Sequence, residues 1–307
     1  MSILFSDEIL NTIYNELSLA KESVQIITAY CKLNALEKLS AQIPTAISSK
    51  KLLVRFRLSD IASGSTDFSI LEYCLSHRWE VYIRFDLHAK TYIIDNTRGI
   101  VGSANMTSAG LRLNDKANYE IASFVNLTDE DKKKVERLFS DSLKITADVL
   151  SSLKKQYSTL NFNNLSDKSL SWNIDILNKF RPEITTLFSY ELPDTNVIPT
   201  GNEFLSFLEI HADSGKHQIK DTFRYSNCYS WLLSTLRKNN GCMYFGHLTD
   251  ELHDALVEDP KPYRKDVKIL LSNLLAWVQS LQMEDVIIDV PNHSQRIRLA
   301  AALLSEE

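Results

Sequence analysis

Residues 88–120, HAKTYIIDNTRGIVGSANMTSAGLRLNDKANYE, decide how the rest of the chain is interpreted. Residues 91–94 form a β-branched and aromatic run, and Ile100 and Val101 form a second apolar pair. Between them lies the polar segment 96–99, which ends in glycine. This pattern predicts a strand, a tight turn and a second strand.

The polar residues of this stretch carry the chemistry. Side chains alternate across a strand, so His88 and Lys90 point to one face and Asp95 points to the other. If the strands pair through the turn, an imidazole and an ammonium meet the hydroxyl of Ser103 and the amide of Asn105. We therefore expect four functional groups to converge at one place.

Such a pocket suits a phosphate. The ammonium supplies positive charge, and the hydroxyl and amide donate to non-bridging oxygens. Gly102, without a side chain, lets a ligand approach the backbone. A helix expected from about residue 107 would turn its N-terminal N–H groups toward the same point. A neutral histidine there is a plausible nucleophile toward phosphorus.

The stretch resembles the HKD motif of the phospholipase D superfamily, H-x-K-x4-D-x6-G-S-x-N. Every fixed position is filled, by His88, Lys90, Asp95, Gly102, Ser103 and Asn105. The segments 109–111 and 118–120 resemble the family's downstream residues, with one departure. About four extra residues, around 114–117, separate them.

The resemblance implies an α/β/α sandwich with a mixed sheet and a metal-independent phosphodiesterase. It makes His88 the nucleophile, and it assigns Lys90, Ser103 and Asn105 to charge stabilisation. Glu120 would orient an imidazole, whereas Asp95 and Gly102 are structural. No second H-x-K occurs in the sequence. Family members with one motif complete their site with a second protomer, so a homodimer is implied.

Composition is that of a globular protein: 44% apolar and 24% charged residues in 307. The sequence has no apolar run of 18 residues, and its first residues read as an amphipathic helix, so we expect no membrane segment and a cytoplasmic location. Four scattered cysteines favour reduced thiols, and no histidine or cysteine pattern indicates a metal site or cofactor.

The charge distribution limits how a polyanion can bind. Net charge is −5 overall, and residues 1–160 hold 20 Lys and Arg against 19 Asp and Glu. A DNA substrate therefore requires a local basic lining. Arg55, Arg57 and Arg84, on two predicted strands, are the candidates for that lining. Solvated charges at a sheet edge would look the same.

The first half of the chain predicts alternating helices and strands, which favours a sheet with helices on its flanks. Helices are expected at 7–21, 33–42 and 68–76, and strands at 23–30, 51–58, 79–85 and 119–125. Residues 59–67 read as a loop. Thr128 is expected to cap one long helix that runs to about residue 155.

The second half is mostly helical. We predict a catalytic domain at 1–157, a linker at 158–167 and an accessory domain at 168–307. The accessory domain has helical patterns at 174–180, 228–238, 248–256 and 266–281, then β-like runs at 285–290 and 295–300. Helices followed by a hairpin suggest a winged-helix arrangement. The last helix is so apolar that it suits a core, which favours dimer or partner contacts over DNA reading.

The substrate class follows from the same resemblance. A single motif, no membrane segment and an appended domain resemble the nuclease branch of the superfamily, including restriction and phage-defence endonucleases. DNA cleavage is therefore the first expectation, with a regulatory or defence-system protein as a candidate partner of the second half. The alternatives are a phospholipid or small phosphodiester hydrolase, and a noncatalytic scaffold that binds nucleic acid.

Overall fold

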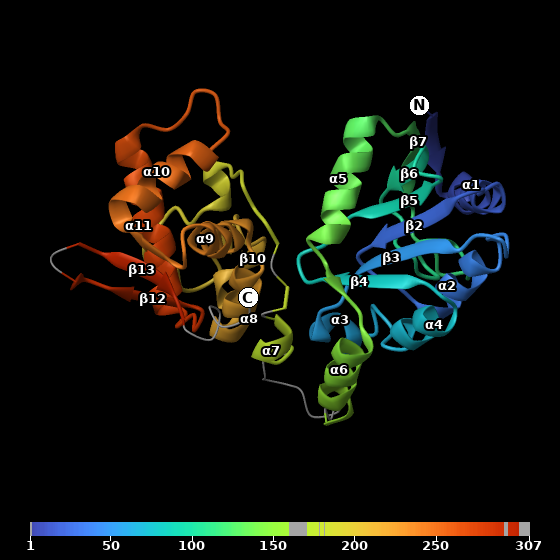
Figure 1. Cartoon of the computed structure of the whole chain (residues 1–307), viewed down its shortest axis with the longest axis horizontal. Coiled ribbons are helices and arrows are strands. Elements are labelled where there is room, and N and C mark those ends of the chain that lie inside the picture. Colours follow the sequence, from blue (N-terminus) through green and yellow to red (C-terminus); the bar gives the residue numbers. More distant parts are fainter. Residues whose placement is uncertain (1, 160–170, 178, 181, 292–293, 301–307) are drawn as a thin grey trace. The chain divides into compact units, whose positions relative to one another are not determined.

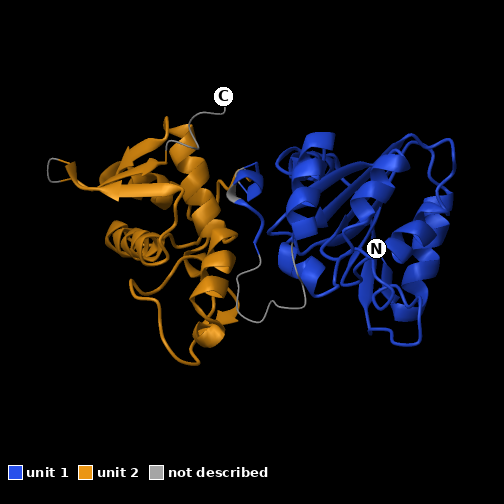
Figure 2. Cartoon of the chain, turned by 90° about the horizontal axis from the view of Figure 1, so that it is seen from below, with its two compact units in different colours: residues 1–166, 170–180 blue, residues 167–169, 181–307 orange. Residues whose placement is uncertain are grey.

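The computed structural model describes residues 2–159, 171–177, 179–180, 182–291 and 294–300. The chain divides into two compact units (Figures 1 and 2). Unit 1 comprises residues 1–166 and 170–180, and unit 2 comprises residues 167–169 and 181–307. Most of the predicted linker, residues 160–167, lies outside the described residues.

Unit 1 alternates strands and helices. Its elements are β1 (Ser2–Phe5), α1 (Ser6–Ser18), β2 (Ser23–Thr28), α2 (Leu33–Ser40), β3 (Ser49–Arg55), α3 (Leu58–Ala62), α4 (Ile70–Ser76), β4 (Glu80–Arg84), β5 (Lys90–Ile94), β6 (Arg98–Gly102), β7 (Ile121–Asn126), α5 (Asp129–Ser140), β8 (Leu143–Lys144), α6 (Ala147–Thr159) and α7 (Ile174–Leu177).

The eight strands form one mixed sheet in the order β1-β7-β6-β5-β2-β3-β4-β8. Strands β2, β3 and β4 are parallel, and the other pairs are antiparallel. All six residues of β2 are buried, as expected of a central strand covered on both faces. The β5–β6 hairpin pairs with β2, so the motif lies in the middle of the sheet.

Helices cover both faces of this sheet, with α5 on one side and α1, α2 and α4 on the other (Figure 1). On the α5 side, Phe139 packs against Ile27, Leu53 and Ile93. On helix α1, Ile9, Ile13 and Leu17 are buried at helical spacing. The predicted α/β/α sandwich with a mixed sheet is confirmed.

Several predicted boundaries differ from the structure. The expected helix from Thr128 to residue 155 is broken into α5 and α6 by β8, because residues 143–144 pair with β4. Residues 59–67, predicted as loop, contain most of α3. Strand β1, which was not predicted, pairs with β7. The predicted cap is confirmed: the Thr128 hydroxyl accepts from Asp131 N at 3.2 Å.

Residues 171–180 pack on unit 1. The Trp172 ring stacks on Phe56 at 5.9 Å between centroids, and its indole N–H donates to the Phe56 carbonyl at 2.6 Å. Phe180 meets Phe85 edge-on at 5.3 Å. Helix α7, which we predicted within the accessory domain, is therefore held by aromatic contacts to the sheet unit.

Unit 2 is mostly helical with small sheets. Its elements are the 3₁₀ helices η2 (Ser189–Glu191) and η3 (Ala212–Ser214), strands β9 (Phe204–Leu205) and β10 (Ile210–His211), α8 (Lys216–Arg224), α9 (Asn227–Lys238), β11 (Cys242–Tyr244), α10 (Phe245–Ala255), α11 (Arg264–Ser280), β12 (Val286–Asp289) and β13 (Arg296–Leu299).

The predicted hairpin gains a third strand, because β11 pairs with β13 in the sheet order β11-β13-β12. The chain order helix α9, strand β11, helices α10 and α11, then the hairpin, is that of a winged-helix arrangement. A large apolar core that includes Trp231, Trp277 and Phe223 holds these elements together. None of the described helices combines the length and apolarity that a membrane span requires.

Candidate active site

The turn between β5 and β6 places the motif. Asp95 and Asn96 both have positive φ, 54° and 51°, and Thr97 N donates to the Ile94 carbonyl at 3.1 Å. These are the features of a type I′ hairpin turn, which asparagine and aspartate tolerate well. The turn therefore lies at residues 94–97, slightly earlier than the predicted 96–99.

The Asp95 carboxylate ties this turn to the start of β2. It accepts the backbone N–H groups of Lys21, Glu22 and Ser23 at 2.8–3.2 Å. Burial raises the pKa of Asp95, but these N–H donors outweigh it and hold the pKa below its usual range. The side chain thus fixes the hairpin in register with its neighbour.

Lys90 begins β5 and lies beside Thr28 of β2 in the antiparallel register. Its side chain is buried, and its ammonium donates to the His88 carbonyl at 2.7 Å. Burial lowers the pKa of Lys90, nearby Arg55 lowers it further, and Glu120 opposes the change. His88, two residues earlier, is exposed. The backbone of the exposed His88 is therefore bonded to a partly desolvated cation.

Asn105 is held from the end of β2. Its side-chain oxygen accepts the Tyr30 backbone N–H at 3.1 Å, and the Thr28 hydroxyl approaches it at 3.5 Å. The same hydroxyl accepts from Met106 N at 3.1 Å. The Asn105 amide nitrogen has no hydrogen-bond partner among the described residues, so it remains available to donate.

Ser103 and Glu120 form a connected pair. The Ser103 hydroxyl donates to the Glu120 carboxylate and accepts Ile121 N at 3.1 Å. Glu120 is buried, and the Asn118 amide donates to its second oxygen at 3.1 Å. Ser6, at the start of α1, anchors the Glu120 backbone through bonds of 2.5 and 3.0 Å. The extra residues at 114–117 therefore leave Glu120 beside the motif.

Gly102 lets strands β6 and β7 pack closely. A Cβ added there would lie 2.5 Å from both the Ala122 Cβ and the Ile121 carbonyl oxygen. We predicted that this glycine lets a ligand approach the backbone. The structure corrects that interpretation, because strand β7 fills the space that a side chain would need.

The helix expected from about residue 107 is absent, and residues 108–112 form turns. Gly110 packs so tightly that an added Cβ would lie 2.5 Å from the Asn105 carbonyl oxygen. Arg112 has a positive φ of 53°, which ends the turn. Residues 107–112 therefore supply no helix N-terminus, and that part of the predicted phosphate pocket is wrong.

The three candidate arginines have different surroundings. Arg55 forms two bonds to Asp60, at 2.8 and 2.9 Å, and donates to the Tyr30 hydroxyl at 2.7 Å. Arg57 donates to the Phe85 carbonyl. Arg84 is buried and doubly bonded to Asp86. The geometry favours Arg55 as a contributor to positive potential near Lys90 and does not favour direct substrate contact by Arg84.

Sequence reasoning missed the residues that orient the motif. Thr28 and Tyr30 lie at the end of β2, Asp60 lies in α3 and Asn118 lies before β7, and no spacing rule marks any of them. The signal that could have found Thr28 and Tyr30 is their place at the C-terminal end of the central strand β2, next to the predicted hairpin.

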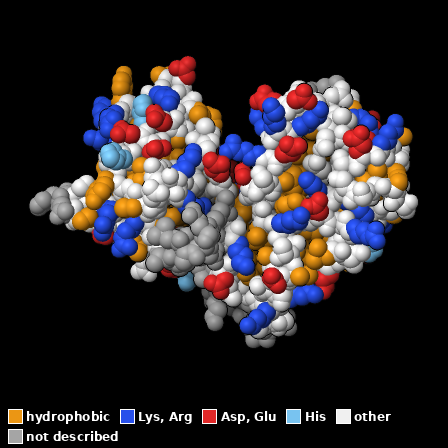
Figure 3. All heavy atoms as spheres, viewed as in Figure 1, with side chains coloured by type: hydrophobic (Ala, Val, Ile, Leu, Met, Phe, Trp, Pro, Cys, Tyr) orange, Lys and Arg blue, Asp and Glu red, His pale blue; other side chains and the backbone are white. Residues whose placement is uncertain are grey.

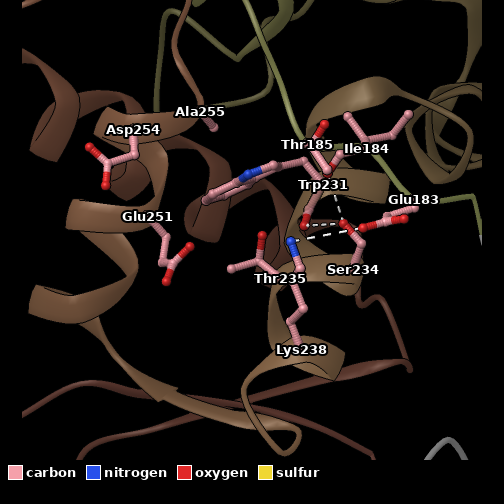
Figure 4. Close-up of a pocket in the computed structure, with 10 residues that line it drawn as sticks. All are labelled: Glu183, Ile184, Thr185, Trp231, Ser234, Thr235, Lys238, Glu251, Asp254 and Ala255. Atoms are coloured by element: carbon pink, nitrogen blue, oxygen red, sulfur yellow. Dashed lines mark hydrogen bonds and ion pairs between the residues drawn. The ribbon is translucent and has the colours of Figure 1, made fainter.

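Other candidate ligand groups are separate from the motif. Among the described residues, no group of three His, Cys, Asp or Glu side chains is placed to hold a metal ion. The four cysteines are free thiols. Unit 2 contains a cavity of about 150 Å³ beside Trp231 and Thr235, shown in Figure 4. Lys238 lies 3.8 Å from Glu183 at its edge. No motif residue lines this cavity.

Part of the chain is similar to known proteins. Residues 13–142 match the family model described as "Cardiolipin synthase, PLD-like domain". No curated protein matches the chain. The chain is similar to the solved structure of Nuc, a phospholipase D family member from Salmonella typhimurium, with 15% identity and a TM-score of 0.38. That match covers 48% of this chain and 97% of Nuc.

Two further structures are similar. NucT from Helicobacter pylori has 16% identity and a TM-score of 0.35, with 47% of this chain and 98% of NucT covered. Phosphatidylserine synthase from Haemophilus influenzae Rd KW20 has 12% identity and a TM-score of 0.34, with 51% and 45% covered.

The matched family model covers residues 13–142, less than half of the chain, and the complete motif lies within that range. This part of the chain is therefore a phospholipase D-like domain.

Proposed function

We propose that the protein is a metal-independent DNA endonuclease whose active site is completed by a second copy of the chain. The observation that carries the proposal is the exposed His88 beside the buried Lys90, with Asn105 and the Ser103–Glu120 pair on the adjoining strand ends. This set can attack a phosphodiester, neutralise its charge and position an imidazole.

The reaction proceeds in two steps. In the first, an imidazole nitrogen of His88 attacks phosphorus, the bond to the leaving oxygen breaks, and the partner's His88 donates a proton to that oxygen. In the second, the partner's His88 accepts a proton from water, the water oxygen attacks phosphorus, and the P–N bond breaks. Lys90 and the Asn105 amide stabilise the non-bridging oxygens in both steps.

A surface beside the motif supports the second copy. Ile3, Phe5, Val101 and Ile121 share one face of the β1-β7-β6 edge by their register. They are 66%, 43%, 44% and 48% exposed. Ser103 has the parity of Val101 and continues this face along β6, whereas Glu120, which precedes Ile121, has the opposite parity and is buried. An uncovered apolar sheet face that adjoins a half-site fits a symmetric contact with another copy.

DNA is favoured over lipid. No described helix could span a membrane, and the motif cation Lys90 lies near enough to Arg55 for their charges to interact. Two neighbouring cations suit a phosphodiester backbone. Cleavage of invading DNA, as in restriction or phage defence, is the cellular setting that this activity would serve. In restriction or phage defence, a regulatory protein bound to unit 2 would restrain the nuclease activity.

The test uses the full chain in EDTA with plasmid DNA, single-stranded DNA, RNA and phosphatidylcholine vesicles. We expect DNA strand breaks with the wild-type protein and none with His88→Ala, because the nucleophile is lost. His77→Ala is the matched control, since His77 is exposed directly after α4 and bonded to the Tyr73 carbonyl. A phosphohistidine should be trapped by rapid acid quench.

Other outcomes would identify the alternatives. Strict dependence on Mg²⁺ would overturn the mechanism. Headgroup release from vesicles with intact nucleic acids would make the protein a lipid hydrolase. Binding of DNA without turnover of any substrate would leave a noncatalytic scaffold.

A further inference from the structure

We propose that helix α11 of unit 2 is a DNA-contacting helix that lies in the major groove of the duplex that the enzyme cuts. The inference rests on the proposed nuclease function and names its substrate as double-stranded DNA. It starts from the topology: α9, β11, α10, α11 and the β12–β13 hairpin follow the winged-helix order. In helix-turn-helix proteins, the second helix of the motif is the one that enters the groove.

Helix α11 has two faces of opposite character. Val267, Leu271, Leu274, Leu275 and Val278 are buried in the core of unit 2. The opposite stripe carries Lys265, Lys268, Ile269, Ser272 and Gln279, all exposed. At about 100° per residue, these five side chains fall within roughly 100° of helix surface. The apolar character that favoured a core role in the sequence therefore belongs to one side only.

The exposed stripe has the chemistry of a groove-reading helix. It contains two lysines, a hydroxyl, an amide and one aliphatic group, and it has no carboxylate. Lysine binds phosphate, glutamine and serine bond base edges, and an aliphatic side chain contacts the thymine methyl group. The stripe is about 21 Å long, from the 14 steps between Lys265 and Gln279 at about 1.5 Å each.

Positive charge is concentrated at the start of α11, although unit 2 as a whole is acidic. Residues 181–307 hold 12 Lys and Arg against 18 Asp and Glu, a net charge of −6. Four of the 12 cations lie within residues 261–268, with Asp266 as the one acidic residue of that segment. Figure 3 shows Lys and Arg side chains over the α10–α11 part of unit 2, with acidic side chains among them. The basic patch is local.

The lysines of the stripe remain available to a ligand. Arg264 is paired with Asp250, and Lys261 donates to the carbonyls of His253 and Asp254 at 3.2 and 3.3 Å. Lys265 lies over the Tyr263 ring at 6.0 Å, and Lys268 has no ion pair among the described residues. Neither ammonium group is in an ion pair among the described residues, and the two lysines lie about one turn apart on the exposed side.

The test is duplex binding by the full chain in the His88→Ala background, which blocks cutting. The variant Lys265→Glu/Lys268→Glu should weaken binding of a fluorescent duplex by at least about tenfold. The slope of the logarithm of affinity against the logarithm of salt concentration should fall in magnitude by about two, because two fewer phosphates are contacted. The matched control is Lys216→Glu/Lys238→Glu, two exposed lysines of unit 2 outside α11, which should bind as the parent does. Lys265→Gln/Lys268→Gln should be intermediate.

Hydrolysis of bis(4-nitrophenyl) phosphate separates this inference from the proposed function. In the His88 wild-type background, Lys265→Glu/Lys268→Glu should hydrolyse the small ester at the parent rate. Unchanged duplex affinity in that variant, with the control also unchanged, would overturn the inference and favour a protein partner for α11. Failure of the wild-type protein to hydrolyse any phosphodiester would instead overturn the proposed function, and the binding result would stand by itself.

Discussion

Individual residues of the motif divide into those that face the substrate and those that hold the motif in place. His88 is exposed and Asn105 is partly exposed, whereas Asp95 accepts from three backbone N–H groups. The sequence predicted this division for Asp95 from strand alternation alone. It could not predict Ser103 donating to Glu120, because that bond depends on how β7 lies beside β6.

Asp95→Asn should destabilise unit 1 because the backbone donors of residues 21–23 lose a charged acceptor. We expect a loss of about 1–3 kcal/mol at pH 7. The folded-state pKa of Asp95 is lowered, so its contribution is present above the unfolded value of about 3.9 and is lost as pH falls through the folded pKa. The difference between wild type and variant should therefore shrink below about pH 4.

Native-state hydrogen exchange of the β5 and β6 amides measures this difference within unit 1. Asp115→Asn, at an exposed loop position, is the control and should change stability by less than about 0.5 kcal/mol. An equal gap at pH 7 and pH 3 would show that the carboxylate charge is not what stabilises the turn.

Among the helices and strands, those with a periodic apolar pattern were predictable from the sequence. The short strands that form only because a partner strand lies beside them were not. The apolar runs of β2, β3 and β4 and the stripe of α1 gave their positions within a few residues. β8 and β11 are two and three residues long, and each exists because a partner strand lies beside it. The same reasoning explains Gly102. A side chain is excluded at this position because β7 lies against β6, and not because a ligand binds there.

Gly102→Ala should therefore force β6 and β7 apart. The new methyl group would meet backbone atoms at 2.5–2.6 Å, which costs about 1–3 kcal/mol and shifts Ser103 relative to Glu120. Gly99→Ala, on the same strand, is the control, because its nearest neighbour at 3.0 Å is the movable end of the Leu127 side chain. Thermal unfolding and small-ester hydrolysis should fall much further in Gly102→Ala than in Gly99→Ala. Equal effects would contradict this account of the glycine.

At the scale of the whole molecule, one chain supplies a single His88 and the proposed chemistry uses two. Neither the spacing of the motif nor the fold of unit 1 determines how many histidines each site contains. That number depends on how the chains assemble. The exposed Ile3, Phe5, Val101 and Ile121 face is the structural feature that makes a shared site testable.

Co-expression of wild-type and His88→Ala chains measures this number directly. If each site needs both imidazoles, activity follows the square of the wild-type fraction, so an equal random mixture retains about one quarter of the activity of the same total protein. Independent sites would retain about one half. Ile3→Glu/Ile121→Glu should abolish both association and hydrolysis, because two carboxylates would be buried in the contact. Leu19→Glu, at a position 60% exposed after α1, is its control and should leave both unchanged. A linear dependence on the wild-type fraction, with full activity in Ile3→Glu/Ile121→Glu, would place the complete reaction within one subunit.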